Sequence, residues 1–170
     1  MTAIPCNCSI TEHARDLIKK SLGKKVRGKD NIVFRIKLFA ELLNGDQKAG
    51  WLLNQIIYWG DRTNDPDGWF WKTYREWHEE IGLSEREIRR IVKGDKRRKT
   101  PKKTLQDVGI EVMVRRAPTG SPTMHYRVNQ AIFFATLVDH LETAYDLRLD
   151  AGESTNGQDE NAAMVTLETD

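Results

Sequence analysis

The sequence predicts a mainly helical fold with a small antiparallel sheet, and two observations carry this prediction. The first is a pair of closely spaced helix-start signals. Thr73-x-x-Glu76 and Ser84-x-x-Glu87 both match the capping box, in which a hydroxyl and a carboxylate satisfy free backbone N–H groups. Gly82 lies between them and indicates a tight turn, so the pattern is that of a helix-turn-helix. The second observation is a pair of alternating apolar segments further along the chain, which predicts a β-hairpin.

The composition predicts one domain with tails. The chain has 170 residues and 39% apolar content, enough for a core, and no apolar run reaches the length of a membrane span. No apolar signal-peptide core is present near the start, so the cytoplasm is the expected compartment. Cys6 and Cys8 are the only cysteines, and with His13 they still fall short of a four-ligand zinc site. We therefore expect no metal and no cofactor.

Residues 1–30 are expected to form a short helix and a basic linker. Ser9 and Glu12 match a capping box, and the mostly polar helix that they open, to about residue 21, is predicted to pack weakly. The linker, residues 23–30, matches most positions of the phosphate-binding loop motif. However, Asp30 replaces the hydroxyl that should hold magnesium, and no apolar strand precedes the loop. No nucleotide site is predicted here.

Residues 31–149 are expected to form the folded domain. Apolar periodicity predicts helices over residues 33–43 and 46–59, separated by the turn residues Asn44 and Gly45. The aromatic side chains of the second helix share its apolar period, which predicts core positions for Trp51, Tyr58 and Trp59.

Residues 69–72 are aromatic and predict a short strand, which would join a hairpin of residues 110–116 and 123–128. Alternation places Ile110, Val112 and Val114 on the same face as Met124, Tyr126 and Val128. Before the hairpin, Thr100-Pro101 predicts the start of a short helix that ends at Gly109. Helices, a short strand, a helix-turn-helix and a hairpin, in this order, describe a winged helix-turn-helix with extra N- and C-terminal helices.

The last predicted helix begins after a cap at Asn129 and runs to about residue 148. Its apolar stripe, which includes Phe134, Leu137 and Leu141, either packs on the domain or pairs with a second copy through residues 130–148. Residues 150–170 are expected to form an acidic disordered tail.

The charge distribution predicts a polyanionic partner. Residues 84–127 contain 13 Lys and Arg against 5 Asp and Glu, whereas residues 150–170 contain 6 acidic residues and no Lys or Arg. On a helical wheel, Arg86, Arg90 and Lys93 lie opposite the apolar side of the second helix of the helix-turn-helix, with Arg89 at the edge of this outward face. Helices that read the major groove of double-stranded DNA carry such a face.

We therefore expect a duplex-DNA-binding protein associated with the nucleoid. The predicted contacts are Arg86, Arg89, Arg90 and Lys93 on the helix; Lys96, Arg97, Arg98, Lys99, Lys102 and Lys103 in the loop after it; and Arg115, Arg116, His125 and Arg127 on the hairpin. The hairpin residues would reach the DNA backbone or minor groove. Trp69, Phe70, Trp71, Tyr74 and Trp77 are predicted to be core, with stacking on single-stranded nucleic acid as the alternative. No catalytic motif is recognisable, so no enzyme is predicted.

A family resemblance covers residues 33–129. It rests on Tyr58-Trp59-Gly60-Asp61-Arg62, Gly68-Trp69-Phe70-Trp71-Lys72-Thr73, Glu76-Trp77, Gly82-Leu83-Ser84 and Ile88-Arg89-Arg90. These segments resemble the winged-helix domains of phage and plasmid replication proteins, of the replisome-organiser and DnaD N-terminal type. The resemblance implies a domain that binds DNA, often self-associates, and serves a mobile element.

Three functions follow as hypotheses. The first is a role in replication initiation or its control. The second is a dimeric transcriptional repressor with the same fold. The third is a winged helix that binds protein, as an accessory or inhibitory subunit of a nucleoprotein complex.

Overall fold

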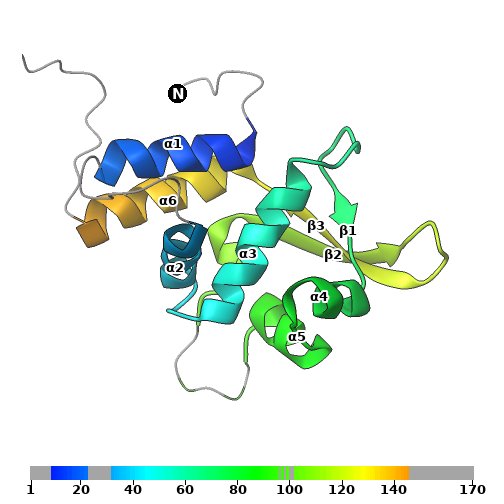
Figure 1. Ribbon diagram of the computed structural model, residues 1–170. Helices are drawn as coiled ribbons and strands as arrows, with labels where there is room; N and C mark the ends of the chain where they lie inside the picture. Colours follow the sequence, from blue (N-terminus) through cyan, green and yellow to red (C-terminus); the bar gives the residue numbers. More distant parts are fainter. Residues whose placement is uncertain (1–8, 23–31, 96, 98, 100–101, 146–170) are drawn as a thin grey trace, which may run out of the picture.

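The computed structural model describes residues 9–22, 32–95, 97, 99 and 102–145 (Figure 1). Within these residues the chain is mainly helical and contains a three-stranded antiparallel sheet, as predicted. The predictions for Cys6, Cys8, the linker of residues 23–30 and the acidic tail fall outside the described residues.

Three helices precede the first strand, a helix pair and a short 3-10 helix follow it, and a hairpin and a last helix complete the fold. Their order is α1 (Ile10–Leu22), α2 (Ile32–Leu42), α3 (Gln47–Gly60), β1 (Phe70–Trp71), α4 (Tyr74–Ile81), α5 (Glu85–Lys93), a 3-10 helix η2 (Leu105–Val108), β2 (Ile110–Arg116), β3 (Pro122–Val128) and α6 (Gln130–Tyr145). The strands lie in the order β1-β3-β2. Strand order and helix order together are those of a winged helix-turn-helix, with α1 and α6 added.

The predicted helix caps are confirmed. Thr73 and Ser84 each form a complete capping box, at the starts of α4 and α5. The carboxylate of Asp46 accepts the backbone N–H groups of Lys48 and Ala49 and so begins α3. These interactions are local in sequence, which is why short motifs predict them correctly.

The sheet register places each apolar side chain as alternation predicts. Ile110 pairs with Val128, Val112 with Tyr126, and Val114 with Met124. Strand β1 adds to the open edge of β3, where Phe70 pairs with Tyr126 and stacks on its ring at a centroid distance of 5.6 Å. The hairpin extends beyond the helices and forms the wing (Figure 1).

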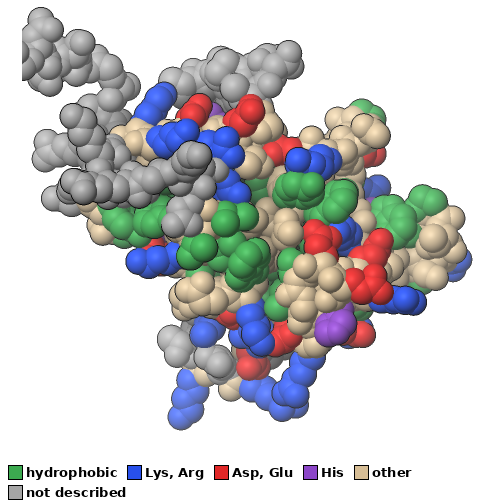
Figure 2. All heavy atoms as spheres, in the orientation of Figure 1, with side chains coloured by type: hydrophobic (Ala, Val, Ile, Leu, Met, Phe, Trp, Pro, Cys, Tyr) green, Lys and Arg blue, Asp and Glu red, His purple; other side chains and the backbone are tan. Residues whose placement is uncertain are grey.

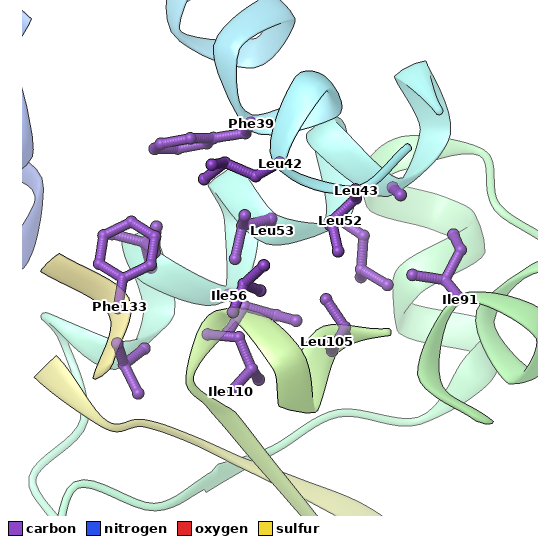
Figure 3. Packing of buried hydrophobic residues seen from close by; sticks show 14 of the residues in the cluster. Phe39, Leu42, Leu43, Leu52, Leu53, Ile56, Ile91, Leu105, Ile110 and Phe133 are labelled. Atoms are coloured by element: carbon purple, nitrogen blue, oxygen red, sulfur yellow. The ribbon is translucent and has the colours of Figure 1, made fainter. Parts of the chain in front are cut away.

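The hydrophobic core lies where α2, α3, α5, η2, the sheet and α6 meet. Ten of its side chains, labelled in Figure 3, are Phe39, Leu42, Leu43, Leu52, Leu53, Ile56, Ile91, Leu105, Ile110 and Phe133. Gly50 permits the close crossing of α2 and α3, since a Cβ there would lie 2.6 Å from the carbonyl oxygen of Ile36. Deep burial of this kind is the main stabilising contribution in a domain of this size.

The N-terminal helix belongs to this same core. Ile10, Ala14 and Ile18 are buried at helical spacing, and α1 lies along α6 (Figure 1). The carboxylate of Asp61, at the end of α3, accepts the backbone N–H groups of Ile10 and Thr11. The predicted weak packing of this helix is therefore wrong, because three of its apolar side chains are buried and the distant Asp61 caps it together with the predicted Ser9.

Two of the predicted core aromatics are exposed. Trp51 is 42% exposed and Tyr58 is 39% exposed, whereas the aliphatic residues Leu52, Leu53 and Ile56 of the same helix are fully buried. Trp51 and Tyr58 are seven residues apart and share the side of α3 that faces away from the core. The prediction failed because an aromatic near an apolar stripe was assigned to that stripe.

The helix predicted to start at Thr100-Pro101 begins later. Thr100 and Pro101 lie outside the described residues, but residues 102–104 are not helical and η2 starts at Leu105. The carboxylate of Asp107 accepts from the backbone N–H and the hydroxyl of Thr104, so Thr104 is the actual start. The end at Gly109 is confirmed, with φ of 88° and a backbone approach that leaves no room for a Cβ.

The last helix packs on the domain. Asn129 caps α6 through the backbone N–H of Ile132, and Phe133, Phe134, Leu137 and Leu141 are buried. Glu41 of α2 accepts from the hydroxyl of Tyr145 and contacts the ring of His140, so the last turn of α6 is attached to α2. Residues 146–148 of the predicted helix fall outside the described residues, and pairing with a second copy stays a prediction.

Candidate nucleic-acid interface

Helix α5 is oriented by its apolar side. Ile88, Ile91 and Val92 are buried, and the turn residue Leu83 is buried between α4 and α5. The opposite side of α5 is therefore turned to solvent. Figure 2 shows Lys and Arg side chains gathered along the lower edge of the molecule, around α5 and the loop that follows it.

Three of the four predicted cations on α5 are exposed together. Arg86 and Lys93 form no ion pair with any described residue. Arg89 lies over the ring of Tyr74, with its guanidinium carbon 5.5 Å from the ring centroid, and pairs with Glu85 one turn before it. Such an exposed pair contributes little to stability and leaves the guanidinium reachable for a polyanion. We call Arg86, Arg89 and Lys93 the α5 cation cluster.

Arg90 does not share this outward position. Its guanidinium lies 2.9 Å from the carboxylate of Asp46 at the start of α3. Lys48, in the same turn of α3, pairs with Glu87 on α5. Because α3 packs beside α5, its N-terminal turn supplies Arg90 with a carboxylate partner that no local motif indicates, and contact of Arg90 with DNA stays a prediction.

The pKa of Glu87 reflects this contact between helices. The Lys48 ammonium, followed by the backbone and side chain of Ser84, lowers the pKa of the Glu87 carboxyl from 4.5 to about 2. Glu87 therefore stays ionised at any physiological pH, and its negative charge compensates the positive charge of Lys48 beside the helix-turn-helix.

A groove of about 350 Å³ runs between α5 and the wing. It is lined by Arg89 and Lys93 from α5, by Lys72, Thr73 and Tyr74 at the start of α4, and by Val114, Ser121, Pro122, Thr123 and Met124 from the hairpin. Val114 is 62% exposed although it shares the inner face of the sheet with buried Tyr126. The groove explains this exposure, because the helices do not extend to the tip of the wing. Tyr74, predicted as a core residue with stacking on single-stranded nucleic acid as the alternative, is half-buried and lines this groove.

The wing divides its cations between two faces. Arg116 alternates with Val114 and so lies on the side of α5, at the wing tip. Arg115 and Arg127 lie on the opposite side, which we call the outer face of the sheet. There both guanidinium carbons approach the ring of Trp69, at 4.8 Å for Arg115 and 4.7 Å for Arg127. The structure thus does not bring Arg115 and Arg127 together with the α5 cation cluster.

His125, another predicted contact, is largely buried. It points to the outer face, as alternation predicts, but it is only 7% exposed. It lies on the central strand, between Trp71 and Met113 in the register, and its Nδ1 contacts the carbonyl oxygen of Thr123. On the same face of the sheet, Trp69 contacts both Arg115 and Arg127.

The loop after α5 is anchored at its far end. The side-chain amide of Asn44 donates to the carbonyl oxygen of Lys103 and accepts the backbone N–H of the same residue. The side chains of Arg97, Lys99, Lys102 and Lys103 are exposed. Lys96 and Arg98, also predicted contacts, lie outside the described residues.

Lys72 is a cation that the fold withdraws from this surface. Its ammonium lies over the rings of Trp59, at 3.9 Å, and Trp77, at 4.9 Å, and it pairs with Glu80. Burial is the main effect on its pKa, which is lowered from the ordinary lysine value. Lys72 thus connects β1 to α3 and α4, and only a small part of its side chain is exposed, at the wall of the α5–wing groove.

None of the helices in the described ranges is long and apolar enough to span a membrane.

Comparisons with models of protein families, with curated proteins and with solved structures gave no match to this chain. The residues and their geometry therefore carry the functional argument.

Proposed function

We propose that this chain binds duplex DNA, with α5 in the major groove and the tip of the wing against the backbone. The observation that carries the proposal is the α5 cation cluster: three cations on one exposed side of the second helix of a helix-turn-helix. The α5–wing groove separates this cluster from Arg116 on the same side of the molecule. A helix and a hairpin arranged in this way can hold a duplex between them.

The cations serve two purposes in this proposal. Arginine can contact guanine through two hydrogen bonds, worth about 1–3 kcal/mol of discrimination against a wrong base. Lys93 and the exposed loop residues Lys102 and Lys103 neutralise phosphates, which fixes the position of the protein on DNA without reading its sequence. Arg90 contributes less, because it already pairs with Asp46.

The biological role is proposed from the family resemblance of residues 33–129. On that basis the chain acts for a mobile element, in replication initiation or its control. A protein-binding role is the second candidate, and Trp51 and Tyr58 favour it. Both are exposed on α3 and line a groove of about 390 Å³.

The test is a titration of a fluorescent duplex at several salt concentrations, with wild type, Arg86→Ala and Lys93→Ala. We expect the logarithm of the affinity to fall linearly with the logarithm of salt concentration, by about 0.9 per phosphate neutralised. Each variant should bind more weakly, and Lys93→Ala should flatten the salt slope by about one contact. The matched control is Lys19→Ala, an exposed lysine on α1 that should bind as wild type does.

Two results would contradict duplex binding by α5. One is the absence of measurable duplex binding at low salt. The other is an equal loss of affinity in Lys19→Ala and Lys93→Ala, which would indicate general charge attraction instead of a site on α5.

A further inference from the structure

The outer face of the sheet combines aromatic rings and cations on the side away from α5. Trp69 and Trp71 are half-buried there, and Met113 is 41% exposed. Phe70 and Tyr126 occupy the inner face and pack into the core. Two half-buried tryptophans on the side away from the core, one in β1 and one just before it, give this face more apolar surface than folding requires.

The charges of this face are not balanced. Arg115 and Arg127 both lie within 5 Å of the centroid of the Trp69 ring, so two positive charges share one aromatic partner. Glu111 pairs with Arg127, but Arg115 forms no ion pair with any described residue. The arrangement leaves one uncompensated cation beside an indole ring, which suits a ligand with both an aromatic part and a negative charge.

We propose that the outer face binds single-stranded nucleic acid, with bases against Trp69 and Trp71 and phosphates at Arg115 and Arg127. Aromatic side chains next to a positive track are the general solution for holding unpaired strands, since every base has a face that can stack. Trp69 and Trp71 are two residues apart on an extended chain, about 7 Å, which is enough for each to contact a separate base.

This site is separate from the one proposed for duplex DNA. Alternation along the hairpin puts Arg115 on one side of the sheet, and Arg116 and Val114 on the other. Duplex DNA in the α5–wing groove and a single strand on the outer face would therefore occupy opposite sides of the wing. The proposal does not depend on duplex binding, and each can fail without the other.

A purely structural role is the competing explanation. In that case the contacts of Arg115 and Arg127 with Trp69 only fasten β1 to the hairpin. Loss of the ring would then lower stability without affecting any ligand. Binding and stability therefore have to be measured on the same variants.

The experiment measures fluorescence anisotropy of labelled 15-mers of thymidylate and of uridylate, with a duplex of the same length beside them. We expect wild type to bind the single strands. Trp69→Leu should bind them about 5- to 150-fold more weakly, the range for the loss of one stacked base. Arg115→Gln should also lower the affinity for the single strands. Both variants should bind the duplex as wild type does. A larger loss of affinity for thymidylate in these variants would identify DNA as the ligand, and a larger loss for uridylate would identify RNA.

The matched control is Trp51→Leu, because Trp51 is an exposed tryptophan far along the chain from the sheet, on α3. Equal losses in Trp51→Leu and Trp69→Leu would overturn the proposal, as would a failure of wild type to bind either single strand at low salt. If Trp69→Leu unfolds, Arg115→Gln tests the proposal alone. The Arg115 side chain is exposed, so its replacement leaves the core intact. A folded Arg115→Gln that binds single strands as wild type does overturns the proposal.

Discussion

One carboxylate, that of Asp46, both caps α3 and binds Arg90 of α5. Its Oδ1 accepts the backbone N–H of Lys48 at 3.0 Å, and its Oδ2 lies 2.9 Å from the guanidinium of Arg90. The helix proposed to enter the major groove is therefore held directly by the first turn of a neighbouring helix. Orientation of α5 and stability of α3 depend on the same side chain.

Asp46→Ala should be more damaging than Arg90→Ala. The alanine removes a helix cap, which costs about 0.5–2 kcal/mol, and it also releases Arg90. Urea denaturation should show this loss, whereas Arg90→Ala leaves the cap in place and should change stability less. In the duplex titration, Arg90→Ala should weaken binding less than Arg86→Ala. Equal effects of the two arginines would mean that Asp46 releases Arg90 when DNA binds.

Acid should weaken the contact between α3 and α5. The folded-state pKa of Glu87, about 2, lies below its ordinary value of 4.5, so ionised Glu87 favours the folded state. This stabilisation is complete above about pH 4.5 and is lost as the pH falls through the folded-state pKa of about 2. Thermal denaturation between pH 2 and pH 6 should show a smaller acid effect for Glu87→Gln than for wild type. Glu142→Gln, at an exposed position on α6, should follow the wild-type curve.

Gly50→Ala should destabilise the domain although alanine favours helices. The new Cβ would lie 2.6 Å from the carbonyl oxygen of Ile36 and 2.8 Å from the backbone nitrogen of Ala40, and neither backbone atom can rotate away. We expect a loss of about 1–3 kcal/mol, as for overpacked cores. Gly60→Ala is the control in the same helix, because its Cβ would meet a side-chain methyl group of Val128 at 3.3 Å. A Gly50→Ala variant as stable as Gly60→Ala would show that α2 and α3 can separate at little cost.

Tyr126→Phe should leave a buried donor without a partner. The indole N–H of Trp77 donates to the hydroxyl of Tyr126 at 3.2 Å, and both side chains are fully buried. Loss of such a bond costs about 1–3 kcal/mol when the remaining group stays buried. Chemical denaturation would measure the change, with Tyr58→Phe as the control, since Tyr58 is 39% exposed. No difference between the two variants would argue that water reaches Trp77.

Local signals predicted the fold well, because they depend on neighbours in sequence. The capping boxes at Thr73 and Ser84, the turn at Asn44 and the shared sheet face of Val112 and Tyr126 are decided within a few residues or by strict alternation. Contacts between distant segments were not predictable in this way. Asp61 caps α1 from 51 residues away, and no pattern near Ile10 indicates it.

The candidate site shows the same division. The outward direction of Arg86 and Lys93 follows from helical periodicity and was predicted. The pairing of Arg90 with Asp46 depends on how α3 packs against α5, and the burial of His125 depends on its place on the central strand, between Trp71 and Met113. Alternation gives the direction of a side chain but not what covers it.

The attachment of Lys103 to Asn44 has a consequence for how this surface can evolve. The basic loop begins at the end of α5, where Arg90 binds Asp46. It ends at Lys103, which is held by Asn44, and Asn44 lies two residues before Asp46 in the same turn. Both ends are thus fixed independently of what lies between them, and lengthening such a loop adds little entropic cost. We therefore expect insertions and substitutions between Asp95 and Lys102 to leave α5 in place, so that the length and charge of this segment can change without a change of fold.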